Sequence, residues 1–530
     1  MEQVHSAPGA VKARMPSRLI RWFRKLPRAG QVLLGGATLI ALLGFFFAEE
    51  NWRGERAWEK CRRQLEAKGV ELEWSKFAPA PVPDEQNFAM TPFLAPLFDF
   101  NPRPLQPGQK LWRDTVSVER AQNFGAELLH EDKPDQIPRR RLEGQLTDLE
   151  AALLQLKKQS NASSVFDSRT AAAAAVLDAL KDYQPVLDEL RTASRRPFSR
   201  FNVQYDAEDP TTILLPHYRV LLQVGKVLQV RGSAELALDK PGLAFDDLRL
   251  MLFLVDSVRA EPFLITMNVR ANLLSMAEQL MWEGLAQRLW SESQLRESQE
   301  QLSQINMLAC LNRGLQAERA AHGNQLFRYI RTHKGAFRQI VGSDDATAGL
   351  SYLLAGPEGW FYQEQAVFHQ LFQTHVADIF DAHTGHMNPS AVKASSKALE
   401  RDLARNSLWH HNAMSRLLLS KLLALFERAA LAQTQAELAA TACALERYRL
   451  ARGVFPEKLE GLVPQFADKI PVDVCGGAPL RYRPLAAGQF LLYGVGWNET
   501  DDGGTTVMNN EGTAPASDVG DWVWPPYPTK

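Results

Sequence analysis

One uninterrupted apolar stretch near the N-terminus limits what this chain can be. Residues 30–48 contain no charged side chain, and as a helix they would span about 28 Å, which is close to the hydrocarbon thickness of a bilayer. A buried core helix usually carries a shorter apolar run. We therefore predict one transmembrane helix over residues 30–48.

The charges on either side of this stretch predict its orientation. Basic residues crowd residues 1–29, whereas Glu49 and Glu50 follow the apolar stretch at once. The positive-inside rule keeps residues 1–29 in the cytoplasm as a basic tail and places residues 49–530 across the membrane. In a bacterial cell, the chain would be a single-pass inner-membrane protein with a periplasmic body.

A cleaved signal peptide is the alternative interpretation of the same stretch. The apolar core of a signal peptide is shorter, however, and the residues after the run lack a small-x-small cleavage pattern. We therefore expect the helix to be retained as an anchor, with the lipid bilayer as one partner.

Residues 49–138 divide into a helix and a proline-rich segment. Trp52, Trp58 and Leu65 are expected to share one face of the helix, which a glycine ends. Eight prolines within residues 77–108 exclude a long helix or a central strand. Because Phe, Leu and Met are interleaved with these prolines, the segment is expected to run extended and packed against another surface.

Amphipathic helical patterns dominate residues 139–430. Leu, Ala and Val recur there at spacings of three and four residues, as on a helix with one apolar face. One stretch is similar to a tetratricopeptide hairpin, with a first helix ending at Leu238 and a turn at residues 239–242. Four apolar residues of the second helix would face back to the first: Ala244, Leu248, Leu252 and Val255. Because no second copy follows at a fixed period, we predict an irregular helical array.

The pattern changes again after residue 430. A helix ending at Gly453, a short helix beginning near Pro456 and two alternating strands predict a small α+β domain over residues 431–530, with an acidic tail. The fold class expected of the whole chain is therefore mainly α, with an α+β domain at its C-terminus.

The C-terminal region resembles the same region of the type II secretion major pseudopilins. The resemblance rests on the order of a helix, a turn at Pro471 and Asp473, Gly476 with Pro479, and the final strand "FLLYGVG". In that family the loop after the last strand binds calcium. The resemblance therefore implies a calcium site here, formed by Asn498, Asp501, Asp502, Asp518 and Asp521.

Two departures separate the chain from the pseudopilins. Their membrane helix begins at a processing site and carries a Glu shortly after it, whereas residues 30–48 contain no Glu. A long helical region also separates the membrane stretch from the pseudopilin-like part, so polymerisation as a pilin is not expected. From "ENWRGERAWEKC" through "PVPDEQNFAMTP" to "YGVGWNETDDGG", the whole chain also resembles a group of large bacterial single-pass membrane proteins, which implies no activity.

The acidic loop also has a simpler interpretation. Residues 498–502 place four acidic or amide side chains in five positions, followed by two glycines, which suits a hard cation. Asn, Asp and Gly are equally typical of tight turns, and the loop lacks the spacing of an EF-hand. A catalytic acid pair is not expected, because Asp501 and Asp502 are adjacent and nothing apolar nearby would keep one protonated.

A second polar cluster lies within residues 369–386. It contains His369, His375, Asp378, Asp381, His383 and His386. Few of these lie at spacings that place two ligands on one helix face, and no H-E-x-x-H motif is present. A polar surface around an aromatic helix face is the favoured interpretation, and a zinc or iron site is the alternative.

Four cysteines fall in the region expected outside the cytoplasm, where disulfides persist. Cys443 and Cys475 belong to the same small domain, so a disulfide is expected between them. Cys61 and Cys310 are left unassigned, and no C-x-x-C spacing indicates a redox or zinc site.

These features favour a membrane-anchored extracytoplasmic scaffold or interaction protein, associated with a secretion or pilus-like envelope assembly. The net charge of −1 argues against nucleic acid as a partner, because no folded segment supplies a clustered basic excess. Helical arrays offer extended surfaces that can hold envelope proteins. The alternative is an extracytoplasmic metal-dependent hydrolase that uses the region from His369 to His386.

Overall fold

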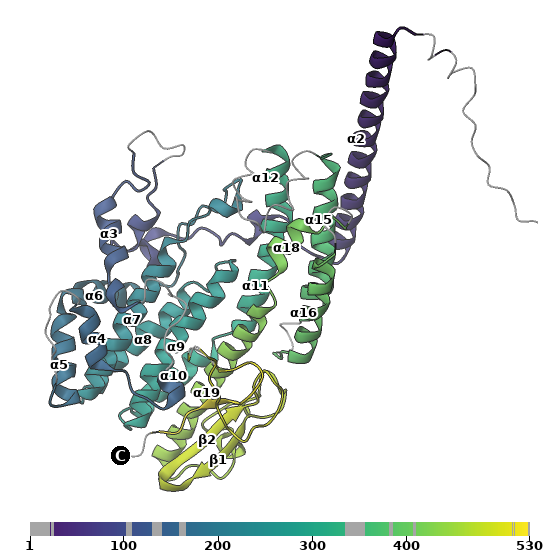
Figure 1. Cartoon of the computed structure of the whole chain (residues 1–530). Coiled ribbons are helices and arrows are strands. Elements are labelled where there is room, and N and C mark those ends of the chain that lie inside the picture. Colours follow the sequence, from purple (N-terminus) through teal and green to yellow (C-terminus); the bar gives the residue numbers. More distant parts are fainter. Residues whose placement is uncertain are drawn as a thin grey trace, which may run out of the picture.

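The described chain is mainly helical with one small sheet near the C-terminus, as the sequence predicts. Figure 1 shows a long N-terminal helix, α2, that leaves a body of packed helices, with the sheet at the far end of the body. The computed structural model describes residues 22, 26–101, 109–129, 140–157, 166–333, 356–380, 385–405, 410–510, 512 and 515–527. Most of the basic tail expected at residues 1–29 lies outside these ranges.

Helix α2 (Arg28–Ala67) runs without a break through the predicted membrane stretch and the helix expected after it. Its most apolar window has a mean hydropathy of 2.0, and none of that window is buried against the body. Gly69, with φ +73°, follows the end of the helix as expected. The second half of α2 packs on the body and buries Glu50, Gly54, Trp58, Cys61 and Leu65.

The expectation that Trp52 shares a face with Trp58 and Leu65 is wrong, because Trp52 is 58% exposed. The buried positions of α2 recur at intervals of three and four residues, which is the repeat of a helix with 3.6 residues per turn. A residue six positions before Trp58 falls on a different side of such a helix.

The proline-rich segment is packed, as expected, although it forms short turns and is not simply extended. Phe88 and Leu97 are fully buried, and the Phe88 ring lies 4.8 Å from the Phe253 ring. Asn87 pairs with the Arg200 backbone, accepting from its N–H at 2.8 Å and donating to its carbonyl at 2.7 Å. The turns are η1 (Trp74–Phe77), η2 (Asp84–Gln86), η3 (Phe88–Met90) and η4 (Ala95–Phe98).

The helices of the array follow one another with short connections. Several begin at an Asp, Asn or Ser whose side chain accepts a free backbone N–H, and Ser291 completes a capping box with Gln294. The α-helices are α3 (Thr115–Asn123), α4 (Leu149–Leu156), α5 (Arg169–Ala179), α6 (Gln184–Ala193), α7 (Pro216–Ala237), α8 (Pro241–Ser257), α9 (Leu264–Ala286), α10 (Glu292–Ser303), α11 (Met307–Ala320), α12 (Phe327–Thr332), α15 (Gly359–Phe372), α16 (Pro389–Leu403), α18 (Ala413–Leu419) and α19 (Ala424–Arg452). The 3-10 segments are η5 (Ala126–Leu128), η6 (Arg140–Glu143), η7 (Lys181–Tyr183) and η8 (Pro210–Thr212), and the π-helical segments are η9 (Ala321–Leu326) and η11 (Gln373–Ala377).

Helices α7 and α8 form the predicted hairpin. Asp239, with φ +56°, turns the chain between them, and the four apolar residues expected to face back are buried. Helix α9 packs on both helices. Gly232 of α7 permits the approach of α9, since a Cβ at that position would lie 2.5 Å from a methyl group of Leu280.

The C-terminal region contains the predicted helix end, short helix and two strands. Helix α19 ends where Gly453 adopts φ +82°, and η12 (Leu459–Leu462) is the short helix. Strand β1 (Arg481–Leu485) pairs antiparallel with β2 (Gln489–Gly494). A third strand, β3 (Trp522–Trp524), which the sequence analysis missed, pairs with the other edge of β2.

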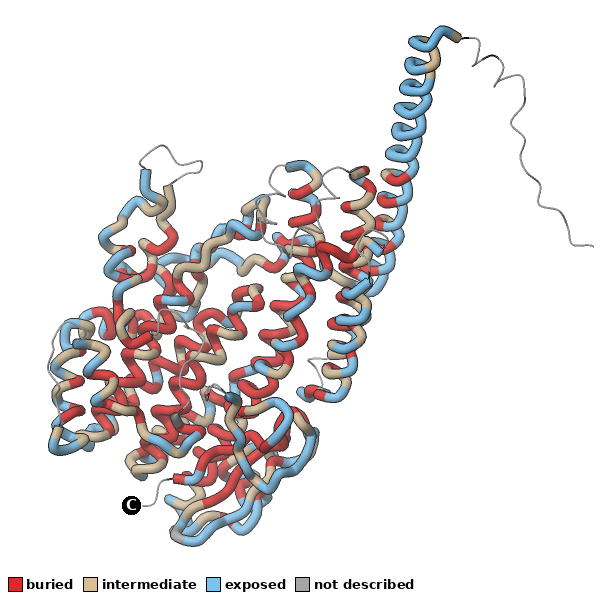
Figure 2. The backbone as a smooth tube through the Cα atoms, in the orientation of Figure 1, coloured by how far each residue is buried: buried red, intermediate tan, exposed pale blue. Residues whose placement is uncertain are grey.

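One core joins the array to the C-terminal region. The expected domain boundary at residue 431 falls inside α19, and one cluster of buried apolar side chains runs from Trp74 to Tyr527. Figure 2 shows buried backbone in both parts and an exposed surface along the projecting half of α2. The Trp282 indole donates to the Pro525 carbonyl at 3.0 Å, which ties the C-terminal tail to α9.

Candidate functional site

Helices α2 and α15 meet with their backbones in contact at Gly54 and Gly359. A Cβ at Gly54 would lie 2.0 Å from the Gly359 carbonyl oxygen, and a Cβ at Gly359 would lie 2.0 Å from the Glu50 carbonyl oxygen. The Gly359 N–H donates to Asn51 Oδ1 at 2.8 Å. Because no side chain fits at either glycine, the contact holds α2 close against the body.

A buried carboxylate strengthens this junction at the end of the apolar stretch. Glu50 is 8% exposed, and its Oε2 accepts from Trp360 Nε1 and Gln363 Nε2, both at 3.1 Å. Its Oε1 accepts from Arg53 Nη1 at 2.5 Å. A buried charge is tolerated when it is paired and hydrogen-bonded, so Glu50 links the two helices as well as flanking the apolar stretch.

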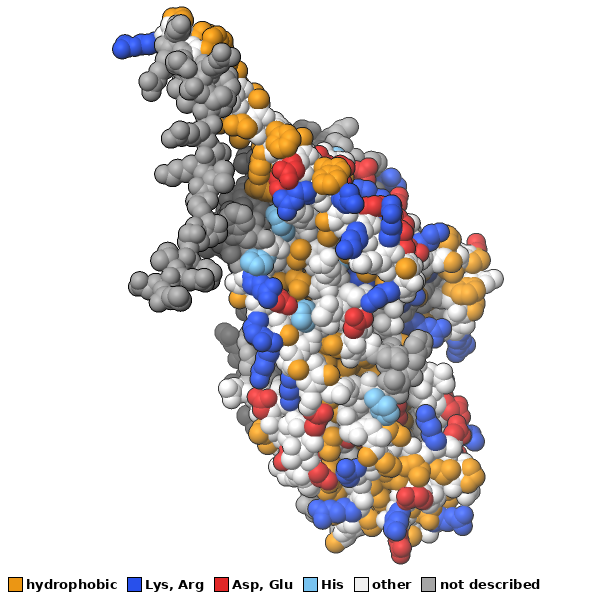
Figure 3. Space-filling model, turned by 90° about the vertical axis from the view of Figure 1, so that its right-hand side faces the viewer, with side chains coloured by type: hydrophobic (Ala, Val, Ile, Leu, Met, Phe, Trp, Pro, Cys, Tyr) orange, Lys and Arg blue, Asp and Glu red, His pale blue; other side chains and the backbone are white. Residues whose placement is uncertain are grey.

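The junction continues along α2 away from the apolar stretch. The Trp58 ring lies 5.2 Å from the His369 ring, and the Cys61 sulfur lies 3.8 Å from the Ala366 carbonyl oxygen. In Figure 3 the projecting half of α2 carries an apolar surface, and charged side chains of both signs gather where the helix meets the body. Half of α2 is therefore part of the body, and the other half leaves it.

His369 is held inside this junction as a neutral imidazole. Its Nε2 lies 3.0 Å from the Gly323 carbonyl oxygen and its Nδ1 accepts from Arg319 Nε at 3.1 Å, so the proton is on Nε2. Burial, with the nearby Arg319 charge, lowers the pKa of His369 to about 3. Since both nitrogens are in use, His369 is not arranged as a metal ligand.

His375 belongs to a separate hydrogen-bonded group with Ser395 and Asp402. Its Nε2 lies 3.0 Å from Asp402 Oδ2, and its Nδ1 lies 3.3 Å from Ser395 Oγ. The connectivity is that of a Ser-His-Asp triad, but the Ser395 hydroxyl also donates to the His375 carbonyl at 2.9 Å and is buried within α16. A nucleophile needs access to substrate and donors for the oxyanion, so we interpret the group as a link between η11 and α16.

The remaining members of the predicted histidine cluster are dispersed. Asp378 accepts from Gln373 Nε2 at 2.5 Å, His386 lies beside Gly477, and Asp381 and His383 fall outside the described residues. Because His369 and His375 are buried, the expectation of a polar surface is wrong for both. Within the described ranges, no group of three or more His, Cys, Asp and Glu side chains could hold a metal ion.

The acidic residues of the C-terminal loop bind the loop's own backbone. Asp521 accepts from the N–H groups of Gly504 at 2.7 Å and Asp502 at 3.2 Å. Asp502 in turn accepts from the Gly520 N–H at 2.9 Å and from Asn498 Nδ2 at 2.8 Å. These contacts close the loop in the manner of a hydrogen-bonded turn.

Asp501 and Asp518 take other partners. Asp501 accepts from the Tyr493 hydroxyl at 3.0 Å and from Arg481 Nε at 3.3 Å, and the charge of Asp518 helps to raise the pKa of Glu427 on α19, which burial raises most. Calcium binding by the five predicted residues stays a prediction.

The structure does not form the disulfide expected between Cys443 and Cys475, since all four cysteines are free and buried. Cys443 faces α9, where its sulfur lies 3.8 Å from the Met281 sulfur. The Cys475 pKa is raised by burial and by charges that include Glu427.

A buried polar network in the array has no counterpart in the sequence-based predictions. Arg141 is 2% exposed, and its Nη2 donates to Glu278 Oε2 at 2.7 Å and to Gln435 Oε1 at 2.9 Å. Its guanidinium lies 4.8 Å over the Trp524 ring. The only sequence signal was the interruption of the apolar pattern of α9 by Glu278 and nearby polar residues.

A second buried group joins α6, α7 and α8. Asp247 accepts from Arg191 and from Arg231 Nη1, the latter at 2.8 Å, and Arg231 Nη2 lies 2.8 Å from Glu235 Oε1. Burial, followed by the Asp247 charge, raises the pKa of Glu235 to about 8. Burial also raises the pKa of Asp247 to about 6 against the opposing effect of the two arginines.

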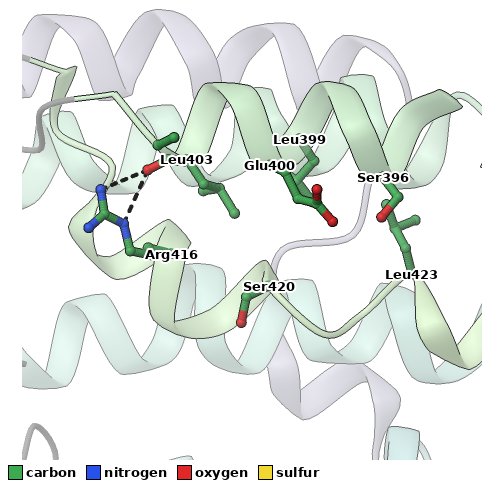
Figure 4. Close-up of a pocket in the computed structure, with 8 residues that line it drawn as sticks. Ser396, Leu399, Glu400, Leu403, Arg416, Ser420 and Leu423 are labelled. Carbon is green, nitrogen blue, oxygen red and sulfur yellow. Dashed lines mark hydrogen bonds between the residues drawn. The ribbon is translucent and has the colours of Figure 1, made fainter. Parts of the chain in front are cut away.

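Two cavities differ in their suitability for a ligand. The cavity between α16 and α18 has a volume of about 250 Å³, which is below the usual range for small-molecule sites. Figure 4 shows Arg416 turned toward the Leu403 carbonyl, to which its Nη2 donates at 2.8 Å, so this guanidinium caps the end of α16. The second cavity, of about 530 Å³, lies between α6, α8 and α10 and borders the Asp247 group through Arg191.

Comparison of the chain with protein-family models, curated proteins and solved structures finds no match. The functional interpretation therefore rests on the contacts within the chain, of which the junction of α2 with α15 is the most distinctive.

Proposed function

We propose that this protein is a single-pass membrane-anchored scaffold, whose body lies outside the cytoplasm and holds other proteins of the cell envelope. The observation that carries the proposal is the continuity of α2. Its apolar half is exposed and long enough to cross a bilayer, while its other half is fixed to the body at Gly54, Gly359 and Glu50. In a bacterial cell the membrane would be the inner membrane, with the body in the periplasm.

The same continuity supports an anchor over a cleaved signal peptide. A signal peptide is removed from the mature protein, whereas α2 is one unbroken helix, and Glu50, two residues after the apolar stretch, is hydrogen-bonded to Trp360 and Gln363 of the body. Cleavage next to the apolar stretch would cut α2 close to Glu50. We therefore expect the anchor to remain in the mature protein.

The scaffold is favoured over the hydrolase because His369 and His375, two of the candidate catalytic side chains, are already committed to structural contacts. His369 and His375 have hydrogen-bonding partners at both ring nitrogens, and the Ser395 hydroxyl is buried. The long helical body supplies surface for partners. The pseudopilin resemblance supports a secretion or pilus-like assembly as the place where the scaffold acts.

Topology tests in cells examine the anchor. A reporter active only outside the cytoplasm, fused after Lys530, is expected to be active, and a reporter active only in the cytoplasm is expected to be silent. A tag placed before Met1 should stay on the full-length protein in membranes washed with alkaline carbonate. An active cytoplasmic reporter, or a mature protein that has lost the tag, would contradict the proposal.

Cross-linking in cells examines the scaffold. The full-length protein should recover the same envelope proteins repeatedly after cross-linking and stringent washing, because a scaffold keeps its partners close. Recovery of none of them from correctly anchored protein would contradict the scaffold and leave the anchor standing.

A further inference from the structure

An arginine-lined groove crosses the outer side of α8. The cavity of about 530 Å³ is bounded by the C-terminal ends of α6 and α10 and by the α8 side chains between them, and its volume lies within the range of ligand sites, roughly 300–1,000 Å³. Its main lining residues are Arg191, Arg195, Arg249, Phe253, Arg259 and Ile305. The groove is separate from the α2 junction.

One arginine of the groove, Arg195, favours an acidic occupant. The lining contains four arginines against Asp246 and Asp256. Arg249 pairs with Asp246 at 2.6 Å and lies 4.0 Å from Glu297, and Arg259 pairs with Asp256 at 2.7 Å. The exposed Arg195 has no carboxylate within 4.0 Å among the described residues, so its charge is available to a ligand.

One wall of the groove is held in place before any ligand arrives. Arg191 is fixed by Asp188 at 2.9 Å and by the buried Asp247, which leaves its side chain only 20% exposed. Preorganised contacts lose less entropy on binding. The floor is apolar, since Leu250 and Ile305 are buried and the half-buried Phe253 packs on Phe88.

The length of the groove distinguishes a peptide from a small anion. Arg249 and Arg259 are ten residues apart in sequence, from the middle of α8 to just beyond its end, which corresponds to about 15 Å along a helix. One phosphate or citrate cannot reach both ends. An extended peptide, at about 3.3 Å per residue, covers this distance with four or five residues.

We propose that this groove binds a short extended acidic segment of a partner protein, which places a carboxylate on Arg195 and an apolar side chain over Phe253. The inference rests on the proposed scaffold function and adds the class of partner sequence. A nucleic acid presents a phosphate at every nucleotide, whereas Arg191, Arg249 and Arg259 are already paired with carboxylates. A segment with an acidic side chain beside an apolar one therefore fits the groove better than a nucleic acid does.

Fluorescence polarisation with the full-length protein in detergent tests the groove. The probe is a fluorescein-labelled acetyl-Glu-Asp-Phe-Glu-Asp-amide peptide, and the matched probe replaces each acid by its amide. We expect Arg195→Glu to weaken binding of the acidic probe at least about tenfold, Arg195→Lys to retain most of the affinity, and the amide probe to bind weakly to every variant. Arg120→Glu, at an exposed site on α3, is the control and should bind as the unmodified protein does.

The proposal is overturned if Arg195→Glu binds the acidic probe as well as the unmodified protein does, or if Arg120→Glu loses as much affinity. It is also overturned if inorganic phosphate or citrate displaces the probe at the concentration that the peptide itself requires, since the site would then be one for small anions. Circular dichroism melting establishes that the variants fold, and Arg249→Glu provides a second charge reversal. The topology reporters are independent of the groove, so loss of probe binding in a correctly anchored protein disproves the groove alone.

Discussion

Gly54 of α2 lies directly against the backbone of Gly359 of α15, although 304 residues separate them in sequence. The contact falls just beyond the exposed apolar stretch, so the body is joined to the proposed anchor through two residues that have no side chain. A close-packed interface has few alternative arrangements. This contact therefore fixes the orientation of the body relative to the helix.

Replacing either glycine should therefore loosen the body. We expect Gly54→Ala and Gly359→Ala each to lower the free energy of unfolding by about 1–3 kcal/mol, since the new Cβ would overlap backbone atoms. Gly36→Ala is the matched control on the same helix, where nothing lies within 4 Å of the added Cβ. Thermal unfolding of the detergent-solubilised proteins measures the difference, and equal melting of Gly54→Ala and Gly36→Ala would contradict the close contact.

The buried Arg141 should be costly to remove. Arg141→Ala leaves the Glu278 carboxylate buried without its cation, and loss of one partner of a buried ion pair typically costs about 3–5 kcal/mol. Arg141→Met, which refills part of the volume, should recover little of this loss because the charge of Glu278 remains. The exposed Arg120→Ala should change stability by less than about 0.5 kcal/mol. Chemical denaturation compares the three variants, and a loss below 1 kcal/mol for Arg141→Ala would argue against a paired buried charge.

Periodicity and turn residues were sufficient to predict most of the elements of the fold. The apolar run predicted α2, the spacing of Leu248 and Val255 predicted the buried side of α8, and the alternation before Gly494 predicted β2. Such signals are local, because each depends on residues within one or two turns of each other. Strand β3 is only three residues long, too short for its alternation to stand out.

The contacts of the candidate site could not be predicted in the same way. Glu50 was recognised as a flanking charge, but its partner Trp360 lies 310 residues away. His369 was expected on a polar surface, yet Arg319 and Gly323 of another helix satisfy both of its nitrogens. A single sequence carries no signal for pairings at such separations, and neither π-helical segment has a sequence signature.

Asp521 should hold the C-terminal loop closed. Asp521→Asn removes the charge that accepts from the Gly504 and Asp502 N–H groups. We expect it to lower the free energy of unfolding by about 1–3 kcal/mol, as for a buried hydrogen-bonded charge. Asp518→Asn, at an exposed position of the same loop region, is the control and should be nearly neutral. Hydrogen exchange at Gly504 measures the local effect, and unchanged protection in Asp521→Asn would contradict this role.

The pseudopilin resemblance adds a calcium prediction for the same loop. A ligand that binds only the folded state raises the melting temperature, so the full-length protein should melt higher in calcium than in a chelator. Asp521→Asn should lack this difference. Identical melting curves of the unmodified protein under both conditions would leave the loop as a hydrogen-bonded turn.

The cysteines should behave as four buried thiols. Burial raises the pKa of Cys443 to about 12, and the thiolate is the reactive form. A thiol reagent at neutral pH should therefore label the native protein slowly and label four cysteines after denaturation without reductant. Labelling of only two in the denatured protein, with a Cys443–Cys475 peptide in the mass spectrum, would restore the predicted disulfide.

The buried Glu235 should make the array sensitive to pH. Its folded-state pKa is raised from 4.5 to about 8, chiefly by burial and then by Asp247, with Arg231 opposing. A raised pKa means that the folded state prefers the protonated carboxyl. The contribution of protonated Glu235 to the free energy of unfolding is therefore complete below pH 4.5 and is lost as the pH rises through about 8.

Glu235→Gln keeps a neutral side chain at every pH. As the pH rises from 5 to 9, the free energy of unfolding of the variant should therefore rise by about 2–4 kcal/mol relative to that of the unmodified protein. Urea denaturation at a series of pH values measures the gain, with the exposed Glu119→Gln as control. A difference that stays constant across this range would show that Glu235 is ionised in the folded protein at neutral pH.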